Sequence, residues 1–272
     1  MKKMKKITKF LINLTSVGSI VLIATLSASQ FAVMGLPTPR IDGKAPTRPG
    51  GPRFIQPIED MLPGDLPLAT GTRGGCDKKD NKQKDLTPLL PENQIGRTVS
   101  EYPVFFFYLP EIQAKVAEFV LQDQSGNQIY KQALTISNLS GVIGVSIPPN
   151  KNVSPLQVGK HYRWSVALIC DPQDRSADVL ETGIVRRVEL SADIRSELEK
   201  ADPRQKAVIY AQTGIWQDAL GTLAAARLAN PNDPDLAADW KILLDSVNLG
   251  EIAAEPIVPI DPQPIAPIDP QP

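Results

Sequence analysis

The chain has 272 residues, of which 29 are Lys or Arg and 30 are Asp or Glu, and 42% of them are hydrophobic. This length suits one or two globular domains, and the near-neutral charge excludes binding of nucleic acid through overall basicity. With one histidine and two cysteines, the chain is too poor in these ligands for a structural zinc site built from them alone. A Ser-His-Asp or Cys-His enzyme would have to use His161.

The N-terminal residues have the pattern of a secretory signal peptide. Residues 1–9 contain five lysines and no acid, and residues 10–24 are mostly apolar. A basic start, a short apolar core and a small-residue exit are the parts of such a signal. We expect residues 1–28 to be removed by cleavage after Ala28 or Ser29. A retained membrane anchor is the alternative, although the apolar core is short for a span of about 20 residues. In both cases we expect the remainder to be periplasmic or extracellular, with membrane contact only through an uncleaved signal.

Residues 29–85 form a leader that is rich in Pro and Gly and, towards its end, in Lys and Asp. A segment of this composition buries little apolar surface, so we expect it to be mostly extended or disordered. Residues 71–75 are glycine-rich and lead into Cys76, and glycine lets a backbone approach a folded body closely. We therefore expect the leader to dock at Cys76.

The two cysteines, Cys76 and Cys170, are the strongest chemical signal in the chain. In an exported protein a lone pair of cysteines is expected to be joined. We predict a structural disulfide that ties the leader to the end of a core strand. Free thiols or bonds between chains are the alternatives, and the wide spacing of the pair disfavours a redox motif.

Residues 86–190 have the pattern of an antiparallel β-sandwich of the immunoglobulin or fibronectin type. Short runs of β-branched and aromatic residues recur between turn residues, as is typical of such sandwiches. Ala117, Phe119 and Leu121 share one parity of their run and are expected to face the core. A hairpin turn is expected at residues 125–127. The expected strands cover residues 104–108, 115–122, 129–136, 142–147, 161–169 and 183–190.

Tyr162, near the start of the strand expected over residues 161–169, fits a tyrosine corner. In that feature a tyrosine hydroxyl bonds a backbone group a few residues upstream. Leu156 before it and Trp164 after it both fit the arrangement. The alternative is that Tyr162 is an ordinary core aromatic.

Residues 191–252 have the signals of several short helices. Ser191 can cap the first, and Asp202 and Asp233 each stand before a proline suited to the first helical position. Glycine, or asparagine followed by proline, is typical of helix ends. The expected ends are at Gly214, Asn230 and Gly250.

The middle pair of these helices resembles a tetratricopeptide repeat, although Pro203 and Lys206 stand at two of its usual positions. Because one repeat is visible and stacked repeats need more, we expect a helical hairpin packed on the sandwich. The residues at the spacing of that repeat are Ala207, Tyr210, Gly214, Ala219, Leu223, Ala226 and Pro231. The candidate partner-binding residues of the hairpin are Tyr210, Trp216 and Trp240, of which the two tryptophans are alternatively core or interdomain contacts.

Residues 253–272 form a proline-rich tail in which Pro-Ile-Asp-Pro-Gln-Pro occurs at 259–264 and again at 267–272. Alternating prolines remove backbone donors and favour polyproline II. The tail is therefore either a solvated extension or a ligand for an aromatic groove of a partner.

Three acids in one loop, Asp171, Asp174 and Asp178, are weak candidates for a calcium site. Their spacing is not that of an EF-hand, and a turn in which Arg175 pairs with one of the acids is the simpler interpretation. We expect no metal and no cofactor. The glycine-rich residues 71–75 lack the ending of a phosphate loop, and no mixture of aromatic and basic residues indicates a nucleic-acid site.

Several strings of the chain resemble a known family. They include Ser-Glu-Tyr-Pro-Val-Phe-Phe-Phe-Tyr-Leu-Pro at 100–110, Cys-Asp-Pro-Gln-Asp-Arg-Ser at 170–176 and Gly-Ile-Trp-Gln-Asp-Ala-Leu at 214–220. With shorter matches at 71–76, 86–91, 162–164 and 210–211, they resemble the cyanobacterial domain-of-unknown-function family 928 over about residues 70 to 250. The resemblance implies an exported, cyanobacterial-type envelope protein and carries over no catalytic residue.

These observations favour a non-enzymatic binding or scaffolding module of the cell envelope, whose unknown protein partner meets the helical hairpin or the tail. A carbohydrate- or small-ligand-binding protein is the first alternative, with Tyr102, Phe105, Phe107 and Tyr108 as a surface platform. A hydrolase that uses acids in the loop 171–178 is the second alternative.

Overall fold

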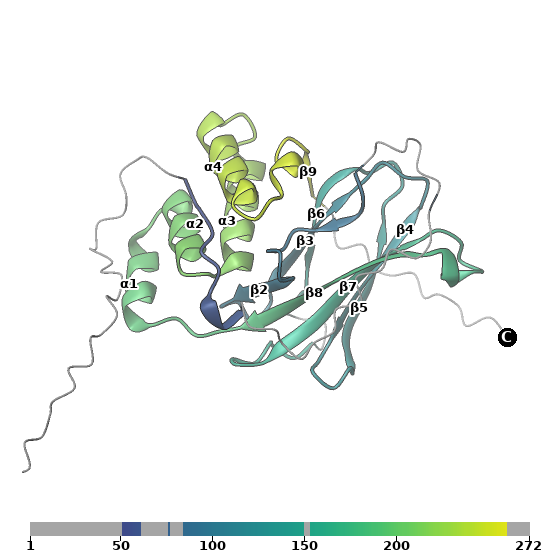
Figure 1. Cartoon of the computed structure of the whole chain (residues 1–272), viewed down its shortest axis with the longest axis horizontal. Coiled ribbons are helices and arrows are strands. Elements are labelled where there is room, and N and C mark those ends of the chain that lie inside the picture. Colours follow the sequence, from purple (N-terminus) through teal and green to yellow (C-terminus); the bar gives the residue numbers. More distant parts are fainter. Residues whose placement is uncertain (1–50, 61–75, 77–83, 150–152, 260–272) are drawn as a thin grey trace, which may run out of the picture. The chain divides into compact units, whose positions relative to one another are not determined.

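The computed structural model of the protein describes residues 51–60, 76, 84–149 and 153–259. These residues fold as an α+β unit that contains two mixed β-sheets and four α-helices (Figure 1). The predicted signal peptide, most of the leader and residues 260–272 of the tail lie outside the described residues. Within the described part of the chain, no helix has the length and apolarity that crossing a membrane needs.

The smaller sheet has four strands in the order β1-β3-β6-β9. They are β1 (Thr87–Pro88), β3 (Val104–Leu109), β6 (Gly141–Ser146) and β9 (Ile257–Val258). Neighbours pair antiparallel except β6 and β9, which are parallel. The tail therefore begins in a sheet: its residues 257–258 pair with β6, where the prolines predicted an extended solvated segment.

The larger sheet has five strands in the order β2-β8-β7-β4-β5. They are β2 (Ile95–Thr98), β8 (Val179–Arg187), β7 (His161–Ile169), β4 (Val116–Gln122) and β5 (Gln128–Thr135). Only the edge pair β2 and β8 is parallel among these described strands. The sequence pattern did not predict β1, β2 or β9, because each is too short for its alternation to be seen.

Alternation predicted the buried face of the larger sheet. Ala117, Phe119 and Leu121 are fully buried, as expected from their shared parity. The predicted hairpin turn lies between β4 and β5, where the Asp123 carboxylate accepts hydrogen bonds from the backbone N–H groups of Ser125 and Asn127. The chain reverses here because the Asp123 side chain provides hydrogen-bond acceptors for the backbone N–H groups of the turn.

Aromatic side chains from both sheets meet in the core. The ring of Phe105 on β3 lies 5.0 Å from that of Phe119 on β4 and 5.6 Å from that of Trp164 on β7, centroid to centroid. Phe107 and Tyr108 are buried too, with 0% and 5% of their surface exposed. Residues 105–108 are thus core, and the alternative in which Phe105, Phe107 and Tyr108 form a surface platform is wrong.

The hydrogen bond expected of Tyr162 is present. The backbone N–H of Gln157 donates to the Tyr162 hydroxyl at 2.9 Å, five positions upstream in the chain. Tyr162 is otherwise buried at the start of β7. The bond ties the segment that precedes β7 to the strand itself, which is what a tyrosine corner does.

The four helices are α1 (Ala192–Lys200), α2 (Pro203–Gln212), α3 (Trp216–Ala229) and α4 (Pro234–Asp245). Three of the four have the N-terminal cap that the sequence predicted, and α3 begins after Ile215 without a side-chain cap. Ser191, Asp202 and Asp233 each accept a hydrogen bond from a backbone N–H in the first turn of their helix. Such caps satisfy backbone donors that the helix itself leaves unpaired.

One predicted helix end is wrong. Asn230 is the C-terminal cap of α3 and Gly214 follows α2 with a φ of +75°, as expected. The last helix, however, ends at Asp245 rather than near Gly250, which begins a short 3-10 helix over Gly250–Ile252. Asn248 supplies the left-handed residue after α4, with a φ of 62°. Asparagine tolerates that conformation better than most residues, so a glycine was not needed there.

Part of the leader packs against the helices instead of being extended in solvent. We call residues 51–60 the strap. The backbone N–H of Ile55 donates to the Ala211 carbonyl at 3.0 Å, and the Phe54 ring packs edge-on against Trp216 at 5.1 Å. Pro52 is buried and Phe54 is half-buried, whereas Ile55 and Ile58 are exposed, so the strap docks through a few contacts that composition alone did not reveal.

Gly214 is the position where helix end and strap meet. A Cβ on this residue would lie 2.4 Å from Cγ of Pro57, and the backbone has a φ that side chains rarely adopt. Only glycine therefore suits both the end of α2 and the close approach of the strap. These two requirements explain why position 214 is a glycine.

The strap ends in a buried acid. Asp60 is 6% exposed, and its Oδ2 accepts a hydrogen bond from Nε of Arg97 on β2 at 2.6 Å. Its Oδ1 lies 3.7 Å from an amino nitrogen of Arg186 on β8. One carboxylate thus joins the strap to two neighbouring strands of the larger sheet.

We expect Asp60→Ala to lower the free energy of unfolding by about 3 kcal/mol, because it removes one member of a buried ion pair. Urea denaturation measures this loss without adding salt that would screen charges. Glu189→Ala is the matched control, since Glu189 and Arg195 form a pair in which both side chains are largely exposed. That change should cost less than about 1 kcal/mol. Equal effects of the two changes would contradict a structural role for Asp60.

Candidate functional site

The two cysteines are joined as predicted. Cys76 and Cys170 form a disulfide across a sequence separation of 94 residues. Cys76 is 7% exposed and belongs to the hydrophobic core, and Cys170 directly follows β7. The bond is consistent with an exported protein, because disulfides persist in oxidising compartments.

The three loop acids that were weak metal candidates make local hydrogen bonds. Asp174 accepts from the Ser176 backbone N–H and hydroxyl, which lowers the pKa of its carboxyl, and Asp178 pairs with Arg175. Asp171 accepts from a backbone N–H two residues on. Across the described ranges, no group of three His, Cys, Asp or Glu residues is placed to hold a metal ion. The arrangement matches the loop interpretation with its Arg175 ion pair.

Two of the three candidate partner-binding residues are inside the protein. Trp216 and Trp240 are both 0% exposed, so as surface contacts they are wrong and as core residues they are confirmed. The Trp216 Nε1 donates to the Leu89 carbonyl at 2.8 Å, and the guanidinium of Arg227 lies over the Trp240 ring. Tyr210 is half-buried and lines a pocket.

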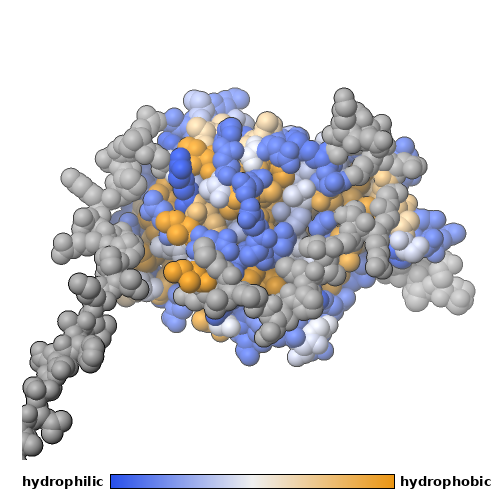
Figure 2. All heavy atoms as spheres, viewed as in Figure 1, coloured by the Kyte–Doolittle hydropathy of each residue, from blue (hydrophilic) through white to orange (hydrophobic). Residues whose placement is uncertain are grey.

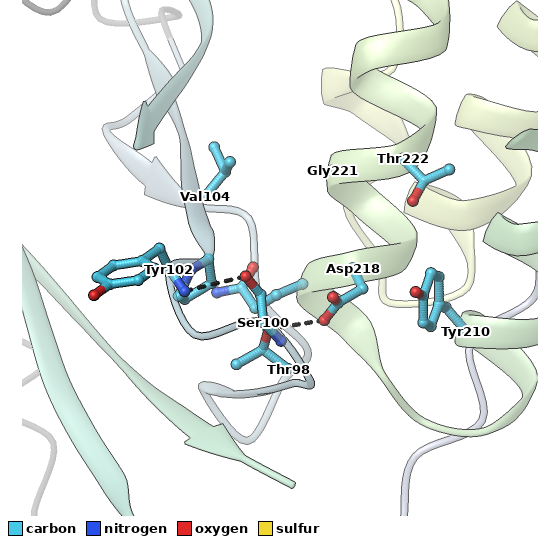
Figure 3. Close-up of a pocket in the computed structure, with 10 residues that line it drawn as sticks. Thr98, Ser100, Tyr102, Val104, Tyr210, Asp218, Gly221 and Thr222 are labelled. Atoms are coloured by element: carbon cyan, nitrogen blue, oxygen red, sulfur yellow. Dashed lines mark hydrogen bonds between the residues drawn. The ribbon is translucent and has the colours of Figure 1, made fainter. Parts of the chain in front are cut away.

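This pocket lies where the segment between β2 and β3 meets α2 and α3, and it has a volume of about 240 Å³ (Figure 3). We call it the Asp218 pocket. Among the described residues that line it, Asp218 is the one charged side chain. Its other polar lining residues are Thr98, Ser100, Tyr102, Tyr210, Gln217 and Thr222.

Asp218 is held in the first turn of α3 and points towards the Thr98–Ser100 segment in Figure 3. Its Oδ2 accepts a hydrogen bond from the Thr98 hydroxyl at 2.8 Å and another from the Val99 backbone N–H at 3.1 Å. Burial raises the pKa of this carboxyl to about 6, against the opposing effect of these bonds. The Tyr210 hydroxyl also has a raised pKa, first because of burial and then because of the Asp218 charge.

Gln217 supplies the second unusual group of the pocket. Its side chain is 3% exposed, and among the described residues neither Oε1 nor Nε2 has a hydrogen-bond partner. A Cβ on Gly96 would lie 3.1 Å from Gln217 Cγ, so the glycine on β2 makes room for this side chain. A buried amide without partners costs about 1–3 kcal/mol for each unpaired group. Gln217 is thus a residue of the pocket lining whose buried amide has an unpaired donor and an unpaired acceptor.

Sequence reasoning did not select Asp218 or Gln217 as site residues. Both stand in the string 214–220, and the opposite wall of the pocket comes from the string 100–110, so two strings that carry the family resemblance meet here. That coincidence was a usable signal. It was missed because a lone Gln-Asp pair in a helix has no chemical pattern of its own.

We expect Asp218→Asn to stabilise the protein at pH 8. The pKa of this carboxyl is about 6 in the folded protein and 3.8 in the unfolded chain. Its protonation therefore stabilises the folded state fully below pH 3.8, and this contribution is lost as the pH rises through 6. Because Asp218 keeps some exposed surface, we expect a gain of about 1–2 kcal/mol rather than the roughly 3 kcal/mol of the full shift. Urea denaturation at pH 8 and pH 4 should show the difference at pH 8 only.

Asp245→Asn is the control for that comparison. Asp245 pairs with Lys241, and both side chains are largely exposed. We expect this variant to track the wild type within about 0.5 kcal/mol at both values of pH. A loss of stability in Asp218→Asn at pH 8 would show that the carboxylate is needed structurally.

A second pocket surrounds His161 and has a volume of about 460 Å³. The His161 Nδ1 lies 2.8 Å from Nε2 of Gln124. Burial, Arg186 and Lys160, in that order, lower the pKa of the imidazole. His161 is therefore a hydrogen-bonded residue whose surroundings disfavour its protonated form.

A search of curated proteins finds no relative of the chain. The family model described as Domain of Unknown Function (DUF928) matches residues 68–257. That match includes both walls of the Asp218 pocket, the disulfide and all four α-helices. The chain therefore belongs to the family Domain of Unknown Function (DUF928).

Proposed function

We propose that this chain is an exported, non-enzymatic binding module of a cell envelope of cyanobacterial type, and that the Asp218 pocket receives a group from a protein partner. The observation that carries the proposal is the Gln217 amide, which is buried without partners beside a carboxylate whose ionisation burial opposes. Buried polar groups are nearly always hydrogen-bonded in a finished structure. Groups left unpaired in a pocket wall are what a ligand would satisfy.

Two features support export. The first residues have the pattern of a signal peptide, and the Cys76–Cys170 bond suits an oxidising compartment. In the native host, the intact mass under non-reducing conditions tests this part. We expect a mature N-terminus at Ser29 or Gln30 and a mass lower by two hydrogens. An unprocessed chain with two free thiols would overturn export.

In finer detail, we propose that the two sheets form a sandwich of the immunoglobulin type and that α2 and α3 form a hairpin of the tetratricopeptide type. The aromatic contacts between β3, β4 and β7 support the sandwich, and so does the bond from Gln157 to Tyr162. Gly214 between α2 and α3 supports the hairpin. This architecture leaves one end of the hairpin against the Thr98–Ser100 segment, which is where a partner would enter.

Partner capture with pocket variants tests the binding function. The tagged chain is crosslinked in the envelope fraction of the native host, and the captured proteins are compared among wild type, Asp218→Asn and Asp245→Asn. We expect Asp218→Asn to lose a partner that Asp245→Asn keeps. Because Asp218→Asn is expected to be the more stable variant, its loss of capture would not reflect unfolding. Equal capture by all three would contradict binding through this pocket.

A second candidate function is hydrolysis with Asp218 as general acid or base. The raised pKa of Asp218 favours it, because catalytic carboxyls are often tuned towards neutral pH. We rank it below binding because glycoside hydrolysis needs a second carboxyl, and the described lining has Asp218 alone. Turnover of nitrophenyl glycosides or esters that disappears in Asp218→Asn would reverse this order.

Binding of a carbohydrate or other small ligand is the remaining alternative. The aromatic platform that this alternative requires is not on the surface, because Phe105, Phe107 and Tyr108 are buried. Tyr102 lines the Asp218 pocket, but its hydroxyl donates to the Val153 carbonyl at 3.2 Å. On the face seen in Figure 2, hydrophobic residues are interspersed with hydrophilic ones, so that view offers no broad apolar platform either.

A further inference from the structure

We infer that the group entering the Asp218 pocket is a basic side chain, lysine or arginine, of a partner polypeptide. The inference rests on the proposed function and names the chemistry of its ligand. It is carried by the Asp218 carboxylate, by the unpaired Gln217 amide and by the size of the pocket that both residues line.

Asp218 accepts hydrogen bonds from the Thr98 hydroxyl and the Val99 N–H, but it meets no positively charged side chain among the described residues that line the pocket. The described lining contributes Thr98 and Ser100 from the β2–β3 segment, Tyr210 from α2, and Gln217 and Thr222 beside Asp218 on α3, all of them without positive charge. An ionised carboxylate in such surroundings is unfavourable until a cation approaches it. A lysine or arginine that enters would supply that counter-charge at neutral pH.

The Gln217 amide favours a polypeptide over a free amine. Ammonium and guanidinium groups only donate hydrogen bonds, so they can satisfy Oε1 of Gln217 and the Asp218 carboxylate. Nε2 of Gln217 is also unpaired and needs an acceptor. A main-chain carbonyl next to the basic side chain provides one, whereas a small organic cation does not.

The dimensions fit one side chain. The volume of about 240 Å³ lies below the roughly 300–1,000 Å³ of sites for drug-sized ligands. The Tyr210 ring and Val104 line the same space and can pack on the aliphatic stem of a lysine or arginine. The pocket is therefore suited to a single long side chain whose charged group is at its tip.

Gly221 offers a way to close the pocket without disturbing the core. It lines the pocket from the second turn of α3, and the nearest atom to a Cβ built on it is Cε2 of Phe106 at 3.9 Å. Gly221→Met places a long, helix-favouring side chain in the space that a ligand would occupy. Gly221→Ala is the matched control, because its methyl group fits at ordinary contact distance.

The experiment is a titration of the isotope-labelled full mature chain, followed by NMR. The probes are the capped peptides Gly-Arg-Gly and Gly-Lys-Gly, the neutral Gly-Gln-Gly and the small cation butylguanidinium. The readouts are the side-chain amide signals of Gln217 and the carboxyl carbon of Asp218. We expect a basic peptide at pH 7.5 to shift both saturably and to lower the pKa of Asp218.

The neutral peptide and butylguanidinium should each bind at least about tenfold more weakly, a difference of about 1.4 kcal/mol. Binding of the basic peptides should also weaken at least about tenfold at pH 4.5, where Asp218 is protonated. Asp218→Asn and Gly221→Met should abolish the shifts, and Gly221→Ala should retain them.

Other results separate the two proposals. Equal binding of Gly-Gln-Gly would overturn the basic side chain, and equal binding of butylguanidinium would overturn the polypeptide source. If no probe binds while Gly221→Met still abolishes partner capture, the basic chemistry falls and the binding function stands. If no probe binds and capture is unaffected by both Gly221→Met and Asp218→Asn, both proposals fall.

Discussion

Replacing both Cys76 and Cys170 by alanine is expected to lower the free energy of unfolding by about 4–5 kcal/mol. The bond joins residues 94 positions apart, so it removes many conformations from the unfolded chain. The doubly substituted chain avoids a leftover thiol. Urea denaturation of the double variant against the oxidised wild type measures the difference.

The wild type itself provides the control for that experiment. Reduced with dithiothreitol, it has the same sequence as the oxidised protein but lacks the bond. It should unfold at the same urea concentration as the double variant. If both lose less than about 1 kcal/mol, the loop-closure account is wrong for this protein. A loss confined to the double variant would instead indicate that the Cys76 side chain matters through packing, because it is buried in the core.

Trp216→Ala is expected to cost about 4–5 kcal/mol, at the upper end for truncation of a buried tryptophan. Trp216 is fully buried, packs on Phe54 of the strap and donates its Nε1–H to the Leu89 carbonyl. The change leaves a cavity where strap, helix and sheet meet, and it leaves Leu89 without this donor. Loss of the strap should also expose residues 51–60 to proteolysis.

The hydrogen bond can be separated from the packing by a matched pair of substitutions. Trp216→Phe keeps an aromatic ring and loses the bond to Leu89, whereas the Trp240 Nε1 has no acceptor among the described residues. Both tryptophans are fully buried. Trp216→Phe should therefore be worse than Trp240→Phe by about 1–2 kcal/mol. Equal losses would mean that the Trp216 bond contributes nothing beyond ring packing.

Local patterns predicted the features that depend on a few neighbouring residues. The alternation of Ala117, Phe119 and Leu121 predicted a buried strand face, and the acids before prolines predicted the starts of α2 and α4. These predictions hold because a strand face and a helix cap are satisfied within a few residues of chain. The prediction that the last helix ends near Gly250 was wrong, because nothing in the neighbouring sequence distinguished Gly250 from Asn248 as the residue that follows that helix.

The candidate site could not be predicted in this way. Asp218 lies 120 residues from its partner Thr98, and nothing near either residue specifies the other. Burial raises the pKa of Asp218, and that burial is produced by α3 packing on the β2–β3 segment. The docking of the strap could not be predicted for a related reason. Asp60 binds Arg97, and Arg97 lies on β2, a strand too short to be recognised from the sequence pattern.

By itself, the sequence determined the α+β class, the disulfide pairing, three helix caps and the buried face of β4, because composition, cysteine count and short-range periodicity are sufficient for these. Only the tertiary structure decided which aromatics are accessible, that the leader also docks through residues 51–60, and which polar groups are left unpaired. Trp216, Trp240 and residues 105–108 became core, and Asp218 and Gln217 became the pocket. Solvent exposure and hydrogen-bond satisfaction depend on what arrives from distant parts of the chain, and short-range patterns do not contain that information.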